Sequence, residues 1–178
     1  MTTNSKNEYL TTKESEFVKV IKDNEGIIYK IARMYTKGSD NMNDLYQDIV
    51  YQLWKYFDTF KGESKRSTWI YRVSLNTAIT QWRKEKRKGQ KVDIEHLFLQ
   101  KEDDYDDEFE NRLKLVYAHI KKLDPVEKGL MLLLLEGKKY AEIAEITGFS
   151  ASNVGTRISR IKKKLKEQII KDHDHDTR

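Results

Sequence analysis

The sequence contains no cysteine, a single proline and only eight glycines among its 178 residues. Without cysteine the chain can form neither disulfides nor cysteine-ligated zinc sites, and it has no thiol nucleophile. The scarcity of proline and glycine leaves long stretches in which a helix can continue without interruption. Segments that alternate between apolar and polar residues are hard to find. We therefore expect an all-α fold.

Long apolar runs are also missing from the chain. The longest, Leu130 to Leu135, is far shorter than the roughly 20 residues that a helix needs to span a bilayer. The N-terminal residues, MTTNSKNEYL, are polar and do not resemble a signal peptide. We therefore expect a cytoplasmic protein with no membrane insertion.

The sequence also lacks a recognisable catalytic site. The four histidines are scattered, at His96, His119, His173 and His175, and the carboxylates of 103–108 have no spacing typical of acid–base pairs. The segment EGKKY lacks the glycine spacing and the hydroxyl residue of a phosphate-binding loop. The terminal HDHDTR could bind a metal weakly, but we interpret it as a disordered tail. We expect no enzyme activity, no cofactor and no metal site.

Positive charge is concentrated in two separate parts of the chain. The formal net charge is +5, with basic residues gathered in 61–88 and in 151–171, and acidic residues gathered between them in 89–110. This distribution predicts two basic modules joined by an acidic connector. Such an arrangement suits contact with a polyanion at two separated points.

Helical periodicity and composition predict two small helical domains. The predicted divisions are a flexible tail at 1–13, a helical domain at 14–88, an acidic linker at 89–107, a second helical domain at 108–171 and a tail at 172–178. In the first domain we expect helices at 14–35, 44–57 and 68–87, with a turn at 37–43. Gly26 is a possible break in the first of these helices.

The segment from Ser67 to Lys88 separates into two stripes when it is drawn as a helix. Apolar side chains between Tyr71 and Trp82 form one stripe, which would face a core. The other stripe consists of Arg72, Asn76, Thr80, Arg83 and Arg87, with Trp69 one turn above. Cations neutralise phosphates, an amide can read a base edge and an aromatic ring can stack on an unpaired base. The alternative is a solvated amphipathic helix whose basic end complements the helix dipole.

The predicted helix at 44–57 also has a polar face opposite its apolar stripe. That face consists of Asp44, Gln47, Asp48, Tyr51, Gln52 and Lys55. A polar, partly aromatic and locally acidic helix face can bind a protein partner. The residues alone nevertheless favour an ordinary solvated face.

The sharpest motif is YAEIAEITGFSASNVGTRISRIKKKLK, which runs from Tyr140 to Lys166. A short helix, a turn at Gly148 and a second helix capped by Ser150 predict a DNA-binding helix-turn-helix rather than a plain helical hairpin. The N-terminal part of the second helix would reach base edges, and its later cations would contact phosphates. The base-edge residues are Ser152, Asn153 and Thr156, and the phosphate contacts are Arg157, Arg160, Lys163 and Lys164.

The two basic modules together resemble a bacterial RNA polymerase sigma factor of the sigma-70 family, in its small extracytoplasmic-function (ECF) subfamily. The first run that carries the resemblance is DLYQDIVYQLWKYFDTFKGESKRSTWIYRVSLNTAITQWRKEKR. The second is LDPVEKGLMLLLLEGKKYAEIAEITGFSASNVGTRISRIKKKLKE. The similarity extends over nearly the whole chain, from about Glu14 to Lys171.

The resemblance implies a partner for each surface. The polar face of the 44–57 helix would bind the clamp coiled coil of the largest polymerase subunit. The loop at 61–66 and the helix after it would grip the melted −10 promoter element, with the loop receiving an extruded base. The −10 set is Lys61, Ser64, Lys65, Arg66, Thr68, Trp69, Arg72, Asn76, Thr80, Arg83 and Arg87. The helix-turn-helix would read the duplex −35 element, and an anti-sigma factor is a further expected partner.

Two positions of the recognition helix depart from the family's common pattern. Asn153 stands where the family often has threonine, and Gly155 where lysine or arginine is frequent. A glycine inside a helix costs ~1 kcal/mol relative to alanine, and it also removes a side chain that could contact DNA. The usual −35 preference should therefore not be assumed for this helix. The main alternative function is a stand-alone helix-turn-helix regulator, which would bind a palindromic operator without polymerase.

Overall fold

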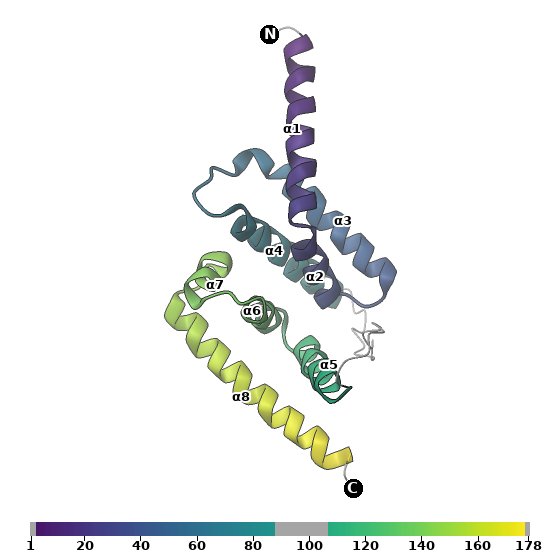
Figure 1. The fold of residues 1–178 in the computed structure, drawn as a ribbon, viewed down its shortest axis with the longest axis vertical. Coiled ribbons are helices and arrows are strands. Elements are labelled where there is room, and N and C mark those ends of the chain that lie inside the picture. Colours follow the sequence, from purple (N-terminus) through teal and green to yellow (C-terminus); the bar gives the residue numbers. More distant parts are fainter. Residues whose placement is uncertain (1–2, 88–106, 177–178) are drawn as a thin grey trace. The chain divides into compact units, whose positions relative to one another are not determined.

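The computed structural model describes residues 3–87 and 107–176, and every element in these two ranges is a helix (Figure 1). The chain divides into two compact units, residues 1–80 and 81–178. The expected all-α fold with two helical domains is confirmed for the described residues. The unit boundary falls inside one long helix, and the domain limits drawn from the sequence stay predictions. The predicted acidic linker lies outside the described residues except for its last position.

The first unit is built from a small set of helices with an apolar centre. Its elements are α1 (Thr3–Asp23), α2 (Glu25–Tyr35), α3 (Ser39–Lys55), the short 3-10 helix η1 (Phe57–Thr59) and the greater part of α4 (Arg66–Arg87). The centre of the unit consists of fully buried side chains: Ile28, Ile31, Leu45, Ile49, Leu53 and Ile70. The residues of this set on α2 and α3 recur at helical spacing, so that each of these helices buries one stripe, and Ile70 lies on α4.

Two helix boundaries near the N-terminus differ from the sequence prediction. Helix α1 begins at Thr3 rather than at Glu14, because no proline or glycine interrupts its sequence. The predicted tail is therefore helical from Thr3 onward. The break between α1 and α2 lies at Asn24 rather than at Gly26. The Asn24 side-chain amide donates to the carbonyl of Val20 at 2.9 Å, which closes the end of α1.

Helix α3 starts earlier than its apolar pattern predicts. The turn expected at 37–43 is confined to its first positions, since Gly38 has a φ of 73° and the helix begins at Ser39. A positive φ is accessible to glycine at no steric cost, which allows this abrupt start. Phe57, expected at the end of α3, instead begins the 3-10 helix η1.

The second unit packs three helices against one long one. Its described elements after α4 are α5 (Asp107–Lys122), α6 (Pro125–Leu135), α7 (Tyr140–Thr147) and α8 (Ala151–Asp176). Helix α8 contacts α5, α6 and α7. Fully buried residues at their meeting surfaces include Ile120, Leu130, Leu133, Ile143, Ile158 and Ile161. The predicted tail at 172–178 is helical as far as Asp176, since no helix-breaking residue follows Gly155.

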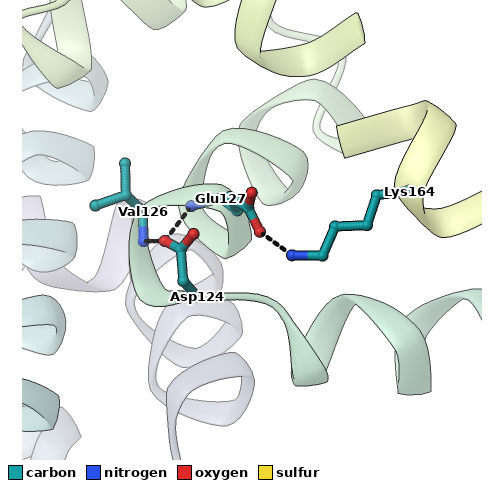
Figure 2. A network of polar contacts seen from close by, with 4 residues as sticks. All are labelled: Asp124, Val126, Glu127 and Lys164. Carbon is teal, nitrogen blue, oxygen red and sulfur yellow. Dashed lines mark hydrogen bonds and ion pairs between the residues drawn. The ribbon is translucent and has the colours of Figure 1, made fainter. Parts of the chain in front are cut away.

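The start of α6 follows the prediction made from its sequence. Asp124 caps the helix, and its Oδ1 accepts hydrogen bonds from the backbone N–H groups of Val126 at 2.9 Å and Glu127 at 3.1 Å (Figure 2). Pro125 occupies the first helical position, where no backbone donor is needed. None of the helices in the described parts of the chain combines the length and the apolar character required to cross a bilayer.

Candidate nucleic-acid and partner-binding surfaces

Helix α4 presents the polar stripe that its sequence predicts. Arg72, Asn76, Thr80, Arg83 and Arg87 are all exposed. The opposite stripe is buried along Tyr71, Leu75 and Ala78, and becomes half-buried towards Ile79 and Trp82. The two-faced character of the helix is therefore confirmed. The contacts of its polar stripe with DNA stay a prediction.

Two residues of the predicted −10 set do not share this exposed stripe. Thr68 is only 6% exposed, and it is buried like Tyr71 and Leu75 of the same helix. Thr68 is therefore not part of the exposed surface that Arg72 and Asn76 form. Trp69 is half-buried, with its ring 5.4 Å from that of Phe60. Trp69 thus belongs to an aromatic cluster and is not a fully exposed stacking surface.

The loop before α4 carries exposed cations at Lys61 and Lys65, whereas Ser64 is half-buried. Arg66, at the end of this loop, is bound within the protein. Its Nη2 donates to Oε1 of Glu16 at 3.1 Å, and its guanidinium lies 5.4 Å from the ring centre of Phe60. The sequence alone gave no sign of this contact, since Glu16 lies 50 positions earlier in the chain.

Helix α3 exposes nearly all of its polar face. Asp44, Gln47, Asp48, Tyr51 and Lys55 are exposed, and Gln52 is half-buried. Tyr51 is 60% exposed, which leaves a large amphipathic ring in solvent beside two carboxylates. Tyrosine is a residue that protein interfaces favour, because its ring is apolar and its hydroxyl is polar. This face therefore has the chemistry of a protein-binding surface.

One ionisable group near this face has a perturbed pKa. Burial, and to a smaller degree the negative charge of Glu25, raises the pKa of the Tyr46 hydroxyl above its usual value. Both effects disfavour the phenolate. Tyr46 therefore stays neutral throughout the physiological pH range, and the local charge of α3 comes from its carboxylates and Lys55.

The predicted helix-turn-helix is present in the second unit. Gly148 ends α7 in a left-handed conformation, with a φ of 78°, and its N–H donates to the carbonyl of Ala144 at 2.8 Å. Only glycine adopts this conformation without a steric penalty. Ser150 Oγ accepts from the backbone N–H of Asn153 at 3.2 Å and caps α8. Val154, Ile158, Ile161 and Leu165 are buried, as their spacing predicts.

The outward face of α8 is exposed along its whole predicted length. It consists of Ser152, Asn153, Thr156, Arg157, Arg160, Lys163 and Lys164. Two of these cations are held by other side chains. Arg157 Nε donates to Asn153 Oδ1 at 2.8 Å, and its guanidinium lies 4.7 Å from the ring centre of Phe149. Lys164 Nζ lies 2.9 Å from Glu127 Oε2 on α6. Figure 2 shows this ion pair.

Gly155 has a packing role that sequence reasoning missed. A Cβ atom at this position would lie 3.4 Å from Cε2 of Tyr140. The ring of Tyr140, which is 41% exposed, therefore lies over α8 where the family often has a long cation. The signal that could have revealed this contact is the coincidence of an aromatic first residue in α7 with a glycine in the second helix.

Comparison with protein families gives a match for each unit. The model described as Sigma-70 region 2 matches residues 20–88, and the model described as Sigma-70, region 4 matches residues 113–165. The RNA polymerase sigma factor SigV of Bacillus subtilis is 30% identical over 167 residues, which cover 90% of this chain and 95% of that protein. This chain belongs to the sigma-70 family.

Further similarities agree with an RNA polymerase sigma factor of the ECF subfamily. The ECF RNA polymerase sigma-E factor of Haemophilus influenzae is 26% identical, over 79% of this sigma factor and 82% of its own length. Among solved structures, RpoE of Bartonella quintana, in complex with the anti-sigma factor NepR, has a TM-score of 0.62 at 22% identity. That match covers 88% of this chain and 95% of RpoE.

A second solved structure shares the fold. CnrH, in complex with the cytosolic domain of CnrY, has a TM-score of 0.63 at 19% identity, and the match covers 89% and 90% of the two chains. The family consists of non-enzymatic transcription initiation factors. Within the described ranges, no group of three or more His, Asp or Glu side chains could hold a metal ion. The findings favour a sigma factor over the stand-alone regulator.

Proposed function

We propose that this sigma factor binds core RNA polymerase and directs it to promoters, where each unit contacts a different element. The first unit would hold the melted −10 element, and the second would read the duplex −35 element. The observation that carries this proposal is that region 2 and region 4 are matched in this order. Each matched region also exposes a one-sided basic helix face, on α4 and on α8.

The face of α3 is the proposed docking surface for polymerase. Its support is the exposure of Asp44, Gln47, Asp48 and Tyr51 on one side of a helix whose other side buries an apolar stripe. A coiled coil offers cations and apolar stems that complement carboxylates and a tyrosine ring. Lys55 and the half-buried Gln52 lie at the C-terminal end of the same surface.

The stripe of α4 and the preceding loop are the proposed −10 interface. Lys61, Lys65, Arg83 and Arg87 are exposed and can neutralise phosphates, while Asn76 can hydrogen-bond a base edge. If this surface binds the unpaired strand more tightly than duplex DNA, the binding energy shifts the melting equilibrium towards the open promoter. The protein then promotes strand opening without any catalytic group of its own.

Helix α8 is the proposed reader of the −35 element. Its exposed N-terminal residues, Ser152, Asn153 and Thr156, are those that a recognition helix places at base edges. Arg160 and Lys163 are exposed and would contact phosphates. The absence of a side chain at Gly155, and the ring of Tyr140 above it, would give this helix a −35 preference of its own.

We also propose that an anti-sigma factor binds this protein and that the protein is cytoplasmic. The solved relatives RpoE and CnrH were each captured with a partner, NepR or the cytosolic domain of CnrY. We infer that a comparable protein restrains this sigma factor. Affinity purification of the tagged chain from its own cells should recover polymerase and, in a separate fraction, a second protein. Recovery of polymerase alone under all growth conditions would contradict the inference.

The direct test of the proposed function is run-off transcription from genomic promoter fragments. Core polymerase is assayed with and without this protein, beside a gel shift of the same fragments without polymerase. We expect initiation that depends on the protein, and little DNA binding by the protein alone. Tight binding alone without rescue of core polymerase would instead support the stand-alone regulator.

A further inference from the structure

The loop at 60–65, which precedes α4, has both of its ends attached to the same distant helix. Before the loop, Asp58 Oδ2 in η1 lies 2.6 Å from Lys13 Nζ of α1. After the loop, Arg66 Nη2 at the start of α4 lies 3.1 Å from Glu16 Oε1 of α1. Lys13 and Glu16 are three residues apart and therefore lie on one side of the helix. Helix α1 thus spans the loop with two ion pairs.

An aromatic contact lies beside the ion pairs. The Phe17 ring meets those of Trp54 and Phe57 edge-on, at centroid distances of 5.0 Å and 5.3 Å. Lys13 Nζ also lies 4.5 Å from the ring centre of Trp54, and the Lys13 side chain is only 15% exposed. Packing against Trp54 restrains the Lys13 side chain, so the ion pair with Asp58 has a well-defined geometry.

We propose that α1 is a positioning element of the −10 interface, with Lys13 and Glu16 as its positioning residues. This inference rests on the proposed function, because it assumes that the loop receives an unpaired base. The two ion pairs fix the separation of the loop ends before DNA arrives. A loop that is ordered in advance loses less conformational entropy on binding, so it binds more tightly. Arg66 acts in this account as the anchor of α4 and not as a phosphate contact.

The rival explanation is that the ion pairs only stabilise the fold. Ion pairs near the protein surface contribute little to stability. A purely stabilising role therefore predicts small changes in melting temperature and no specific change in DNA binding. Simple electrostatic attraction makes a further distinct prediction: replacing Asp58 by a cation should strengthen binding to a polyanion. Positioning predicts the opposite sign, since that change separates α1 from the loop.

The test uses holoenzyme assembled from core polymerase and the full chain, with a fluorescent single-stranded oligonucleotide of the non-template −10 sequence as probe. The variants are Lys13→Glu, Asp58→Lys and the double charge swap. Each single reversal should weaken oligonucleotide binding roughly fivefold, and the swap should restore it to within about twofold of the wild type. Affinity for core polymerase should not change, since α3 is untouched. Lys19→Glu, an exposed position on α1, is the control for charge alone.

Each outcome decides the inference. Stronger binding by Asp58→Lys, a swap that fails to recover, or an equal loss in Lys19→Glu would overturn it. Lys13→Met keeps the packed stem and removes the charge, so it gives an answer if a reversal fails to fold; wild-type binding by that variant would also overturn the inference. If wild-type holoenzyme does not bind the oligonucleotide, the proposed −10 function itself fails. If it binds and the variants match it, only the role of α1 fails.

Discussion

The exposed basic faces of α4 and α8 are held in place by contacts of very different range. On α8, the partner of Arg157 is Asn153, one helical turn away, and the ring beneath it belongs to Phe149 in the adjoining turn. At the start of α4, Arg66 is held by Glu16, which lies 50 positions earlier. The N-terminal part of the proposed duplex-reading face is therefore held by local contacts, although Lys164 farther along α8 pairs with Glu127 of α6. The start of α4, next to the proposed single-strand face, depends instead on a distant helix.

The largest expected effect tests whether the α4 stripe captures the open strand. We predict that Arg72→Ala combined with Arg83→Ala lowers open-complex formation by about tenfold or more, because the variant loses two cations of the proposed −10 interface. Permanganate reactivity of promoter thymines measures the opening. The matched control, Lys22→Ala with Arg33→Ala, removes the same charge from exposed positions of the first unit. Unchanged opening in the α4 variant would remove this site assignment.

A slightly smaller effect is expected from the basic face of α8. Arg157→Ala should weaken holoenzyme binding to a duplex −35 fragment by about tenfold, since charge-assisted contacts are worth about 1.5–3 kcal/mol and part of that is retained through neighbours. Binding to the single-stranded −10 oligonucleotide should not change. Lys166→Ala, an exposed position of the same helix, serves as the control. An equal loss of affinity for the duplex and the single-stranded probe would contradict the assignment of the two faces to different DNA elements.

Substitutions at two glycines compare the two units by their effects on the free energy of unfolding. Gly148→Ala should destabilise the second unit by about 1–2 kcal/mol, because a side chain disfavours the left-handed conformation. Gly26→Ala should instead stabilise the first unit by about 0.5–1 kcal/mol, since Gly26 lies inside α2 with open space around it. Hydrogen exchange of α7 and α2 amides reports each unit separately. The account would be contradicted if the α2 amides exchanged faster than in the wild type in both variants.

The smallest effect separates two neighbouring lysines of α8. Lys163→Ala should weaken promoter binding a few-fold and reduce its salt dependence by about one counterion. Lys164→Ala should change the salt dependence less, because Lys164 is paired with Glu127. A titration of binding against salt concentration measures both slopes. Identical slopes for the two variants would show that Lys164 leaves Glu127 when DNA binds.

The sequence was most informative where structure depends on neighbours along the chain. The turn at Gly148, the cap at Ser150, the cap at Asp124 and the stripes of α4 and α8 all follow from local chemistry and periodicity. The sequence was less informative where tertiary packing decides. The burial of Thr68 shows that a residue at the end of an apolar stripe can join the core even when its side chain is polar.

The contacts that hold the ends of the loop at 60–65 could not be predicted from the sequence. Lys13 and Glu16 lie in or beside a segment that composition assigned to a tail, and nothing local marks Asp58 and Arg66 as their partners. The Tyr140 ring over Gly155 is a similar case, because two unremarkable positions become related only when α7 crosses α8. Helix lengths were also underestimated at both termini, where composition suggested tails but no residue stops the helix.

The most direct test of the two-surface account is site-specific photo-crosslinking in one open promoter complex. A photoreactive residue replaces Asn76 on α4 in one sample and Asn153 on α8 in another, each in assembled holoenzyme. The account predicts that position 76 crosslinks to the non-template strand of the −10 element, and that position 153 crosslinks to duplex DNA at the −35 element. Crosslinking of both positions to the same element, or of position 76 to duplex DNA alone, would contradict it.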